Sequence, residues 1–289
     1  MNRNILSAIK SIDLLFLLTA NLLGLAINHY LGNEFQWTGF WNGLLIFLLI
    51  LIGCKLIGKY FQIKTQSFAM ESKKKQETIF ITLMSGVAFF AISIIPLVSL
   101  IINHLINPTN VLFLSMGIFI IGMVEIFPSQ TTQWGLEEFL KAFLYANIIP
   151  AFAFSLQVNV YHRLVFLLTF PLFFLYIAFF IIDNISSVYD SINESSGSLL
   201  KKIGSFAVLR LHNLSLLMGY LILLAGTFFE LPWKLIWPAL MTIPIGLIQI
   251  WQVNQILSGR KPNIQALVFT AVCIALFTAY FSILYLWLN

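Results

Sequence analysis

The most constraining feature of this sequence is a series of long apolar runs, each about as long as a helix that crosses a bilayer. A membrane-spanning α-helix needs about 20 consecutive, mostly apolar residues. Nine segments fit that template: 12–31, 38–57, 79–102, 110–127, 139–157, 162–183, 207–228, 233–252 and 265–288. We therefore predict an all-α integral membrane protein, a bundle of nine transmembrane helices that forms a single domain over residues 1–289.

The composition indicates that lipid, and not water, surrounds most of the chain. Only 9% of the residues are charged and 60% are hydrophobic, whereas about 25% of the residues in a soluble domain are charged. The net charge of +5 does not indicate nucleic-acid binding, because the basic residues form no continuous stripe. Cys54 and Cys273 lie inside apolar runs without the spacing of a disulfide framework or a zinc site.

The basic residues predict how the bundle is oriented. With nine helices, 14 of the 16 Lys and Arg residues fall on one side: Arg3, Lys10, Lys55, Lys59, Lys64, Lys73, Lys74, Lys75, Lys141, Lys201, Lys202, Arg210, Arg260 and Lys261. Only Arg163 and Lys234 fall on the other side. The positive-inside rule then places the N-terminus in the cytoplasm and the C-terminus outside, and we expect a bacterial inner (plasma) membrane. Long cytoplasmic loops are predicted at about 58–78 and 184–206.

Three acidic residues follow the sixth predicted helix and are candidates for a metal site. If the helix continues past Asp183, then Asp190 and Glu194 project from one face, and Asp183, two turns earlier, shares it. Mg²⁺ binds through a few carboxylates while the phosphates of a substrate complete its shell. We predict Mg²⁺ as a cofactor and these three residues as its ligands.

Several of these features together resemble the UbiA superfamily of intramembrane prenyltransferases. The resemblance covers most of the chain: nine helices, polar loops after the second and sixth, the run Trp-Gly-Leu-Glu-Glu-Phe-Leu over residues 134–140, and Gly197 with Lys-Lys-Ile-Gly over 201–204. It implies a helical bundle in which two Asp-rich motifs hold magnesium ions on the diphosphate of an isoprenyl donor. A lipophilic acceptor, such as an aromatic ring, then captures the allylic cation.

The first Asp-rich motif of that family is degenerate in this chain. Gly58, Lys59 and Gln62 stand where the family has Asn and Asp. In one interpretation, Lys59 and Lys64 bind the diphosphate directly as point charges. In the other, Lys59 pairs with Asp190 or Asp183, and the site is structural or empty.

Two further groups have both a functional and an ordinary interpretation. Arg210, near the start of the seventh predicted helix, could reach a phosphate or simply extend to the membrane surface. Glu125, inside the fourth, is either an intramembrane functional carboxylate or a helix-end residue that reaches the interface. Glu137 and Glu138 precede the fifth helix, where the helix dipole favours acids.

The sequence thus leads to two functional hypotheses. The first is a membrane prenyltransferase that transfers a prenyl group from an isoprenyl diphosphate to a lipophilic acceptor. The second is a non-catalytic UbiA-like protein that binds a quinone, pigment or isoprenoid lipid, or serves as a membrane subunit of a complex. The missing first motif motivates the second hypothesis and makes enzymatic activity an open question.

Overall fold

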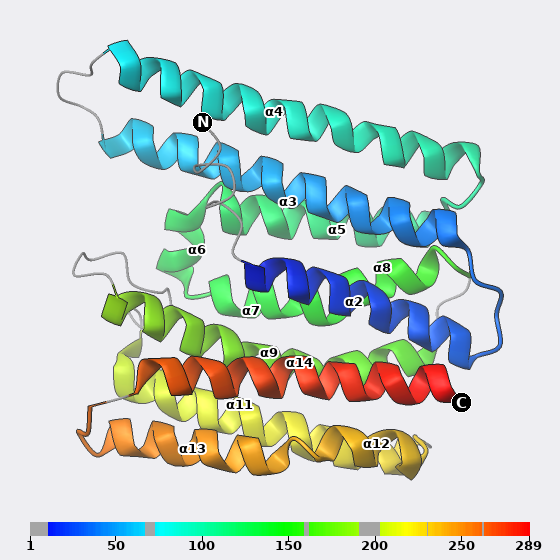
Figure 1. Ribbon diagram of the computed structural model, residues 1–289, viewed down its shortest axis with the longest axis vertical. Helices are drawn as coiled ribbons and strands as arrows, with labels where there is room; N and C mark the ends of the chain where they lie inside the picture. The colour runs from blue at the N-terminus through cyan, green and yellow to red at the C-terminus, as the bar shows by residue number, and fades with distance from the viewer. Residues whose placement is uncertain (1–10, 67–72, 159–161, 191–202, 230, 262) are drawn as a thin grey trace.

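A computed structural model describes residues 11–66, 73–158, 162–190, 203–229, 231–261 and 263–289, and every element in these ranges is a helix (Figure 1). The longer helices are α2 (Ser11–Tyr30), α3 (Trp37–Gln66), α4 (Lys73–Ile102), α5 (Pro108–Glu125), α9 (Arg163–Asp190), α11 (Ser205–Ala225), α13 (Ile243–Leu257) and α14 (Ile264–Leu288). The shorter elements are α6 (Pro128–Trp134), α7 (Glu137–Phe143), η1 (Leu144–Ile148), α8 (Ile149–Ser155), η2 (Gly226–Phe229) and α12 (Trp233–Leu240).

Within the described chain, seven helices are long and apolar enough to cross a membrane. They are α2, α3, α4, α5, α9, α11 and α14, and each coincides with a predicted span. Helices α12 and α13 together are also long and apolar enough to form an eighth span, although a bend of 41° separates them. Pro238 and Pro244 flank the bend, which agrees with the kinks that prolines introduce into transmembrane helices.

The fifth predicted span, 139–157, is helical but is not one continuous α-helix. Residues 137–155 form α7, the π-helical turn η1 and α8 in direct succession. Pro150 lies just after the π turn, where it occupies one of the first two positions of α8. The run passes from one end of the bundle to the other (Figure 1). The described chain therefore has seven candidate spans, or eight with the bent pair, and the count of nine remains a prediction.

The two connections predicted as long loops, 58–78 and 184–206, are helical at both of their ends where the structure describes them. The region 58–78 is mostly helical, because α3 continues to Gln66 and α4 begins at Lys73. Likewise α9 continues past Asp183 to Asp190, and α11 begins at Ser205. Hydropathy predicts where a helix leaves the apolar layer and not where it ends, since residues such as Lys and Gln favour helix in water as well.

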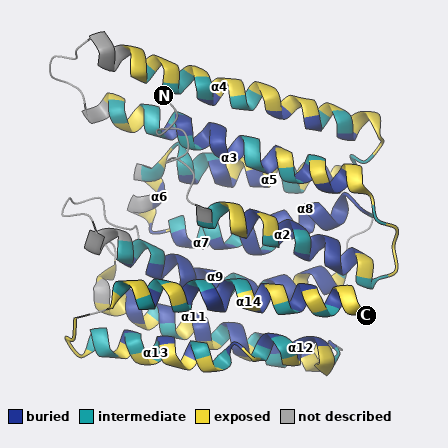
Figure 2. Cartoon of the chain, viewed as in Figure 1, coloured by how far each residue is buried: buried dark blue, intermediate teal, exposed yellow. Residues whose placement is uncertain are grey.

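The helices pack with α9 near the centre of the bundle and α4 at its edge (Figure 2). Of the seven spans, α9 has the most buried residues and α4 the fewest. Helix α4 lies against α3, where Gly53 and Gly86 face each other: a Cβ added to either would stand 3.1 Å from the other's carbonyl oxygen. Small residues of this kind let helix backbones approach closely in membranes.

The bent α12–α13 pair is anchored by a buried chain of hydroxyl groups. The hydroxyl of Thr242, at the bend, lies 2.9 Å from that of Tyr220 in α11 and 2.9 Å from that of Thr278 in α14. In an apolar layer, such groups are stable only when each finds a partner. The chain therefore fixes the break in the helix between two unbroken neighbours.

The ends of the helices separate the charges as the sequence predicted. The basic end of the bundle is formed by the starts of α2, α4, α7, α11 and α14 and the ends of α3, α5, α9 and α13 (left in Figure 1). The basic residues that these helix ends and the α13–α14 connection contain are Lys55, Lys59, Lys64, Lys73, Lys74, Lys75, Lys141, Arg210, Arg260 and Lys261. Arg163 begins α9 and Lys234 lies in α12, both at the opposite end.

Candidate functional site

Charged side chains are drawn into the bundle just inside its basic end. Asp13, in the first turn of α2, forms an ion pair with Lys55 of α3. The two side chains are only 13% and 11% exposed. Ionised groups at this depth are costly unless they are paired, so this contact ties α2 to α3 where both begin to enter the apolar layer.

A second charged group comes from α7. Lys141 donates to the carboxylate of Glu137, one turn earlier, over 2.8 Å. Glu138 is fully buried, and its carboxylate accepts a hydrogen bond of 2.7 Å from the side-chain amide of Asn184 in α9. Both glutamates lie in the first turn of α7, as the sequence predicted. In addition to their favourable position at the helix dipole, they therefore bind specific partners.

Glu125, the last residue of α5, joins the two ion pairs electrostatically. Its carboxylate interacts with the amines of Lys55 and Lys141 and with the acids Asp13 and Glu137. We call these five residues the five-charge cluster. Three acids and two amines give it a net charge of −1 when every group is ionised.

A tight helix crossing holds Glu125 in this position. Gly58 of α3 lies directly against the carbonyl group of Glu125, and a Cβ at Gly58 would overlap that oxygen. Only glycine allows the two backbones to approach this closely. The packing of α3 on α5 therefore requires a glycine at residue 58.

An aromatic cluster lies one helical turn deeper than the five-charge cluster. Its centre is Phe16, three residues after Asp13 on α2. The ring centroid of Phe16 lies 4.8 Å from those of Tyr176 and Phe179 and 5.8 Å from that of Tyr145. Tyr145 likewise follows Lys141 by four residues on the α7–η1 run. Residues three or four apart lie on the same face of a helix, so each ring lies one turn below a charged residue of its own helix.

The sequence-predicted phosphate ligands lie near this region but are less enclosed. Lys59 follows Lys55 by one turn on α3 and is partly buried. Lys64 is exposed, with its amine 5.7 Å from the ring centre of Tyr60. Arg210 is exposed in the second turn of α11. The ion pairs of the described chain are Asp13–Lys55 and Glu137–Lys141, and neither contains Lys59.

The predicted metal ligands are described only in part. Asp183 is partly buried on α9, next to the Asn184 that binds Glu138. Asp190 ends α9, but its side chain, like the whole of Glu194, lies outside the described residues. Within the described residues, no three His, Cys, Asp or Glu side chains are placed to hold a metal ion. Magnesium binding by Asp183, Asp190 and Glu194 therefore stays a prediction.

Sequence reasoning missed three of the charged residues that form the ion pairs of the site, Asp13, Lys55 and Lys141. It treated Lys55 and Lys141 only as topology signals and did not single out Asp13. The available signal was an acid and two amines inside or beside apolar runs, where charged groups are rare and usually functional. Their pairing depends on tertiary packing, since 42 residues separate Asp13 from Lys55 and 46 separate Glu138 from Asn184.

Comparison with known proteins adds no family to this picture. No protein-family model matches the sequence, and no curated protein matches it either. The case for function therefore depends on the chemistry of the residues and on the resemblance in motif and helix order.

Proposed function

We propose that this protein is a UbiA-like membrane prenyltransferase homologue, which transfers a prenyl group from an isoprenyl diphosphate to a lipophilic acceptor. The observation that supports this most is the five-charge cluster stacked one turn above the aromatic cluster. An isoprenyl diphosphate has the same division, with a charged head and an apolar chain. The head would lie at the basic end, and the chain would extend inward along the rings of Phe16 and Tyr145.

The proposed reaction requires charge to be stabilised at both ends of the bond that breaks. The bond between the prenyl C1 and the diphosphate oxygen breaks, and the electron pair leaves with the diphosphate. The allylic cation forms a bond to a carbon of the acceptor, which then loses a proton. Cationic side chains favour the departing diphosphate, and the faces of aromatic rings attract the cation.

The charge of the site decides which residues bind the head. Because both amines of the five-charge cluster already interact with acids, the cluster by itself offers little uncompensated positive charge to a diphosphate. Additional positive charge has to come from residues nearer the membrane surface. Lys59, Lys64 and Arg210 are the candidates, and Mg²⁺ bound by Asp183, Asp190 and Glu194 is the further contribution that the family resemblance implies.

The Asp13–Lys55 pair favours a second candidate function. It fixes a lysine beside the degenerate first motif, where the family resemblance implies metal-binding aspartates. A protein of this kind could bind a quinone, pigment or isoprenoid lipid without reacting with it, or act as a membrane subunit. In that case the head group would be held, but no diphosphate would be released.

We also propose that residues 137–155 are a ninth span and that the basic end faces the cytoplasm. The run is helical and connects the two ends of the bundle. The positive-inside rule gives the direction, because the opposite end has only Arg163 and Lys234. In a bacterium this places the site at the cytoplasmic face of the inner membrane, where isoprenyl diphosphates are soluble.

One assay separates the two functions. The purified protein is incubated with a labelled isoprenyl diphosphate and a lipid extract, with Mg²⁺ or with EDTA, and both labelled product and released diphosphate are measured. We expect product from the wild-type protein and loss of product in Asp190→Ala. Lys59→Gln should weaken binding of the donor by roughly tenfold, the value of one charge-assisted hydrogen bond.

The control is Lys234→Gln, which removes a lysine at the opposite end and should leave both readouts unchanged. Binding of the labelled donor without release of diphosphate would identify the non-catalytic function. Absence of both binding and release in the wild-type protein would refute the prenyltransferase function.

A further inference from the structure

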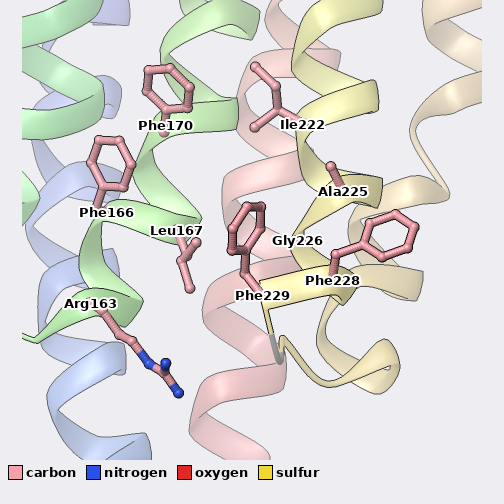
Figure 3. Close-up of a pocket in the computed structure, with 9 residues that line it drawn as sticks. All are labelled: Arg163, Phe166, Leu167, Phe170, Ile222, Ala225, Gly226, Phe228 and Phe229. Atoms are coloured by element: carbon pink, nitrogen blue, oxygen red, sulfur yellow. The ribbon is translucent and has the colours of Figure 1, made fainter.

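An apolar pocket of about 890 Å³ opens between α9 and α11 at the end of the bundle opposite the basic end (Figure 3). Phe166 and Phe170 of α9 form one wall, and Ile222 and Ala225 of α11 form the other. Phe229 of η2 projects between them in the close-up, and Arg163, the first residue of α9, lies at the rim. The volume falls within the range of roughly 300–1,000 Å³ typical of ligand pockets.

The pocket begins where close packing of the two helices ends. At Gly219, α11 touches α9: a Cβ there would stand 3.2 Å from the carbonyl oxygen of Pro171 and 2.6 Å from a methyl carbon of Leu175. Beyond this crossing α11 ends, and the chain continues as the 3₁₀ turn η2. Pro171 has no N–H to donate to the carbonyl of Leu167, which also lines the pocket. The pocket therefore begins just beyond the close contact between Gly219 of α11 and Pro171 of α9.

Its depth in the membrane follows from the spans that border it. The apolar parts of the two helices are Arg163–Ser186 and Phe206–Phe229, so both end at the level of this pocket. The side chains of Phe166 and Phe229 are 49% and 62% exposed, so the described helices leave the pocket accessible from the side. An acyl chain of the bilayer can enter it from the apolar layer, with the head group at the polar surface.

The rim supplies a charge that matches a lipid phosphate. Arg163 has five N–H donors in a planar group that can bind two phosphate oxygens at once, in addition to other contacts. In the described chain, Lys234 is the other Lys or Arg residue at this end, and it does not line the pocket. A single guanidinium beside an apolar pocket is complementary to an amphiphile with one anionic head.

We propose that this pocket binds an anionic phospholipid of the adjacent leaflet, with one acyl chain between α9 and α11 and the phosphate on Arg163. The site is separate from the proposed prenyl-transfer site, and its test does not require that activity. Arginine makes the site selective for the head group, and the aromatic walls hold the chain.

Native mass spectrometry of the purified protein can test this proposal. The protein is offered equal amounts of phosphatidylglycerol and phosphatidylcholine with identical acyl chains. We expect the wild-type protein to bind about ten times as much phosphatidylglycerol as phosphatidylcholine. This ratio corresponds to the free energy of one hydrogen bond to a charged group. Arg163→Gln should abolish this preference while both lipids still bind. The matched control Lys234→Gln should keep the wild-type ratio.

A second variant tests where the chain lies. Ala225→Trp fills the pocket and should lower retention of both lipids, with Ile222→Trp as the alternative if the first variant fails to fold. Equal retention of the two lipids by the wild-type protein would overturn the proposal. So would an unchanged preference in Arg163→Gln, an equal loss of preference in Lys234→Gln, or undiminished binding in the folded tryptophan variant.

Discussion

The five-charge cluster contains two ion pairs that stabilise different levels of structure. Glu137 and Lys141 are one turn apart on α7, so their pair supports a single helix. Asp13 and Lys55 lie on α2 and α3, so theirs is a tertiary contact. Because both side chains of the second pair are almost completely buried, removing either partner leaves the other without compensation in a medium of low dielectric constant.

Replacing Lys55 with alanine should therefore destabilise the fold. We expect a loss of about 3 kcal/mol, in the range measured when one partner of a buried pair is removed, seen as a lower midpoint of unfolding in detergent. The double variant Asp13→Asn with Lys55→Gln should recover much of this loss, since no isolated charge remains. Lys59→Ala, one turn further along α3, is the control. Similar effects from Lys55→Ala and Lys59→Ala would contradict a special role for the pair.

At this scale the sequence predicted the kinds of residue but not their partners. It predicted that the lysines late in α3 and the acids late in α9 lie on the same side of the membrane. Both helices end at the basic end, with Lys59, Lys64 and Asp183 in their last turns. It did not predict that Asp13 would bind Lys55 or that Glu138 would accept a hydrogen bond from Asn184. Such pairs depend on which helix faces are in contact, and hydropathy is nearly uniform around a helix in lipid.

At the scale of helices, the crossing of α3 and α5 connects packing to the candidate site. Gly58 contacts the carbonyl of Glu125, and Glu125 interacts with both amines of the five-charge cluster. Any side chain at residue 58 would push the end of α5 away from α3. The carboxylate of Glu125 would then move away from the two amines, although no charged group had been removed.

Gly58→Ala should for this reason destabilise the protein and disturb the site, although alanine is a better helix former. Gly122→Ala is a matched control on α5, because a Cβ at Gly122 meets no atom within 4 Å. The control should be neutral or more stable by up to about 1 kcal/mol, the difference in helix propensity. The two variants are compared by unfolding midpoint and by binding of the labelled isoprenyl diphosphate. Equal stability of both variants would show that the crossing tolerates a side chain.

The apolar runs predicted the existence of the helices better than their internal breaks. Seven predicted spans are continuous helices, and the bend near Pro238 and Pro244 agrees with a proline signal. The π turn η1 also lies beside a proline, Pro150, although its own sequence Leu-Tyr-Ala-Asn-Ile resembles ordinary apolar helix. Within it, the side-chain nitrogen of Asn147 is buried without a partner.

At the scale of the whole molecule, the distribution of charge orders the ends of the helices. The charge pattern in the sequence predicted which helix ends lie together, and the bundle gathers those ends, with the described basic residues that they contain, on one side. The pattern does not contain the order of the helices within the bundle, because a charge at a helix end does not indicate which helices pack side by side. The central place of α9 and the edge position of α4 therefore had no counterpart in the sequence.

The orientation and the ninth span can be tested together by labelling single cysteines in intact cells. In a background with Cys54→Ala and Cys273→Ala, cysteine replaces Lys64 or Gln130 at the basic end, and Asn33 or His162 at the opposite end. We expect a membrane-impermeant maleimide to label residues 33 and 162 in intact cells, and residues 64 and 130 only after permeabilisation. Residues 130 and 162 flank the 137–155 run, so labelling of both from one side would mean that it does not cross the membrane. Labelling of residue 64 from outside would reverse the orientation and move the proposed diphosphate site away from the cytoplasm.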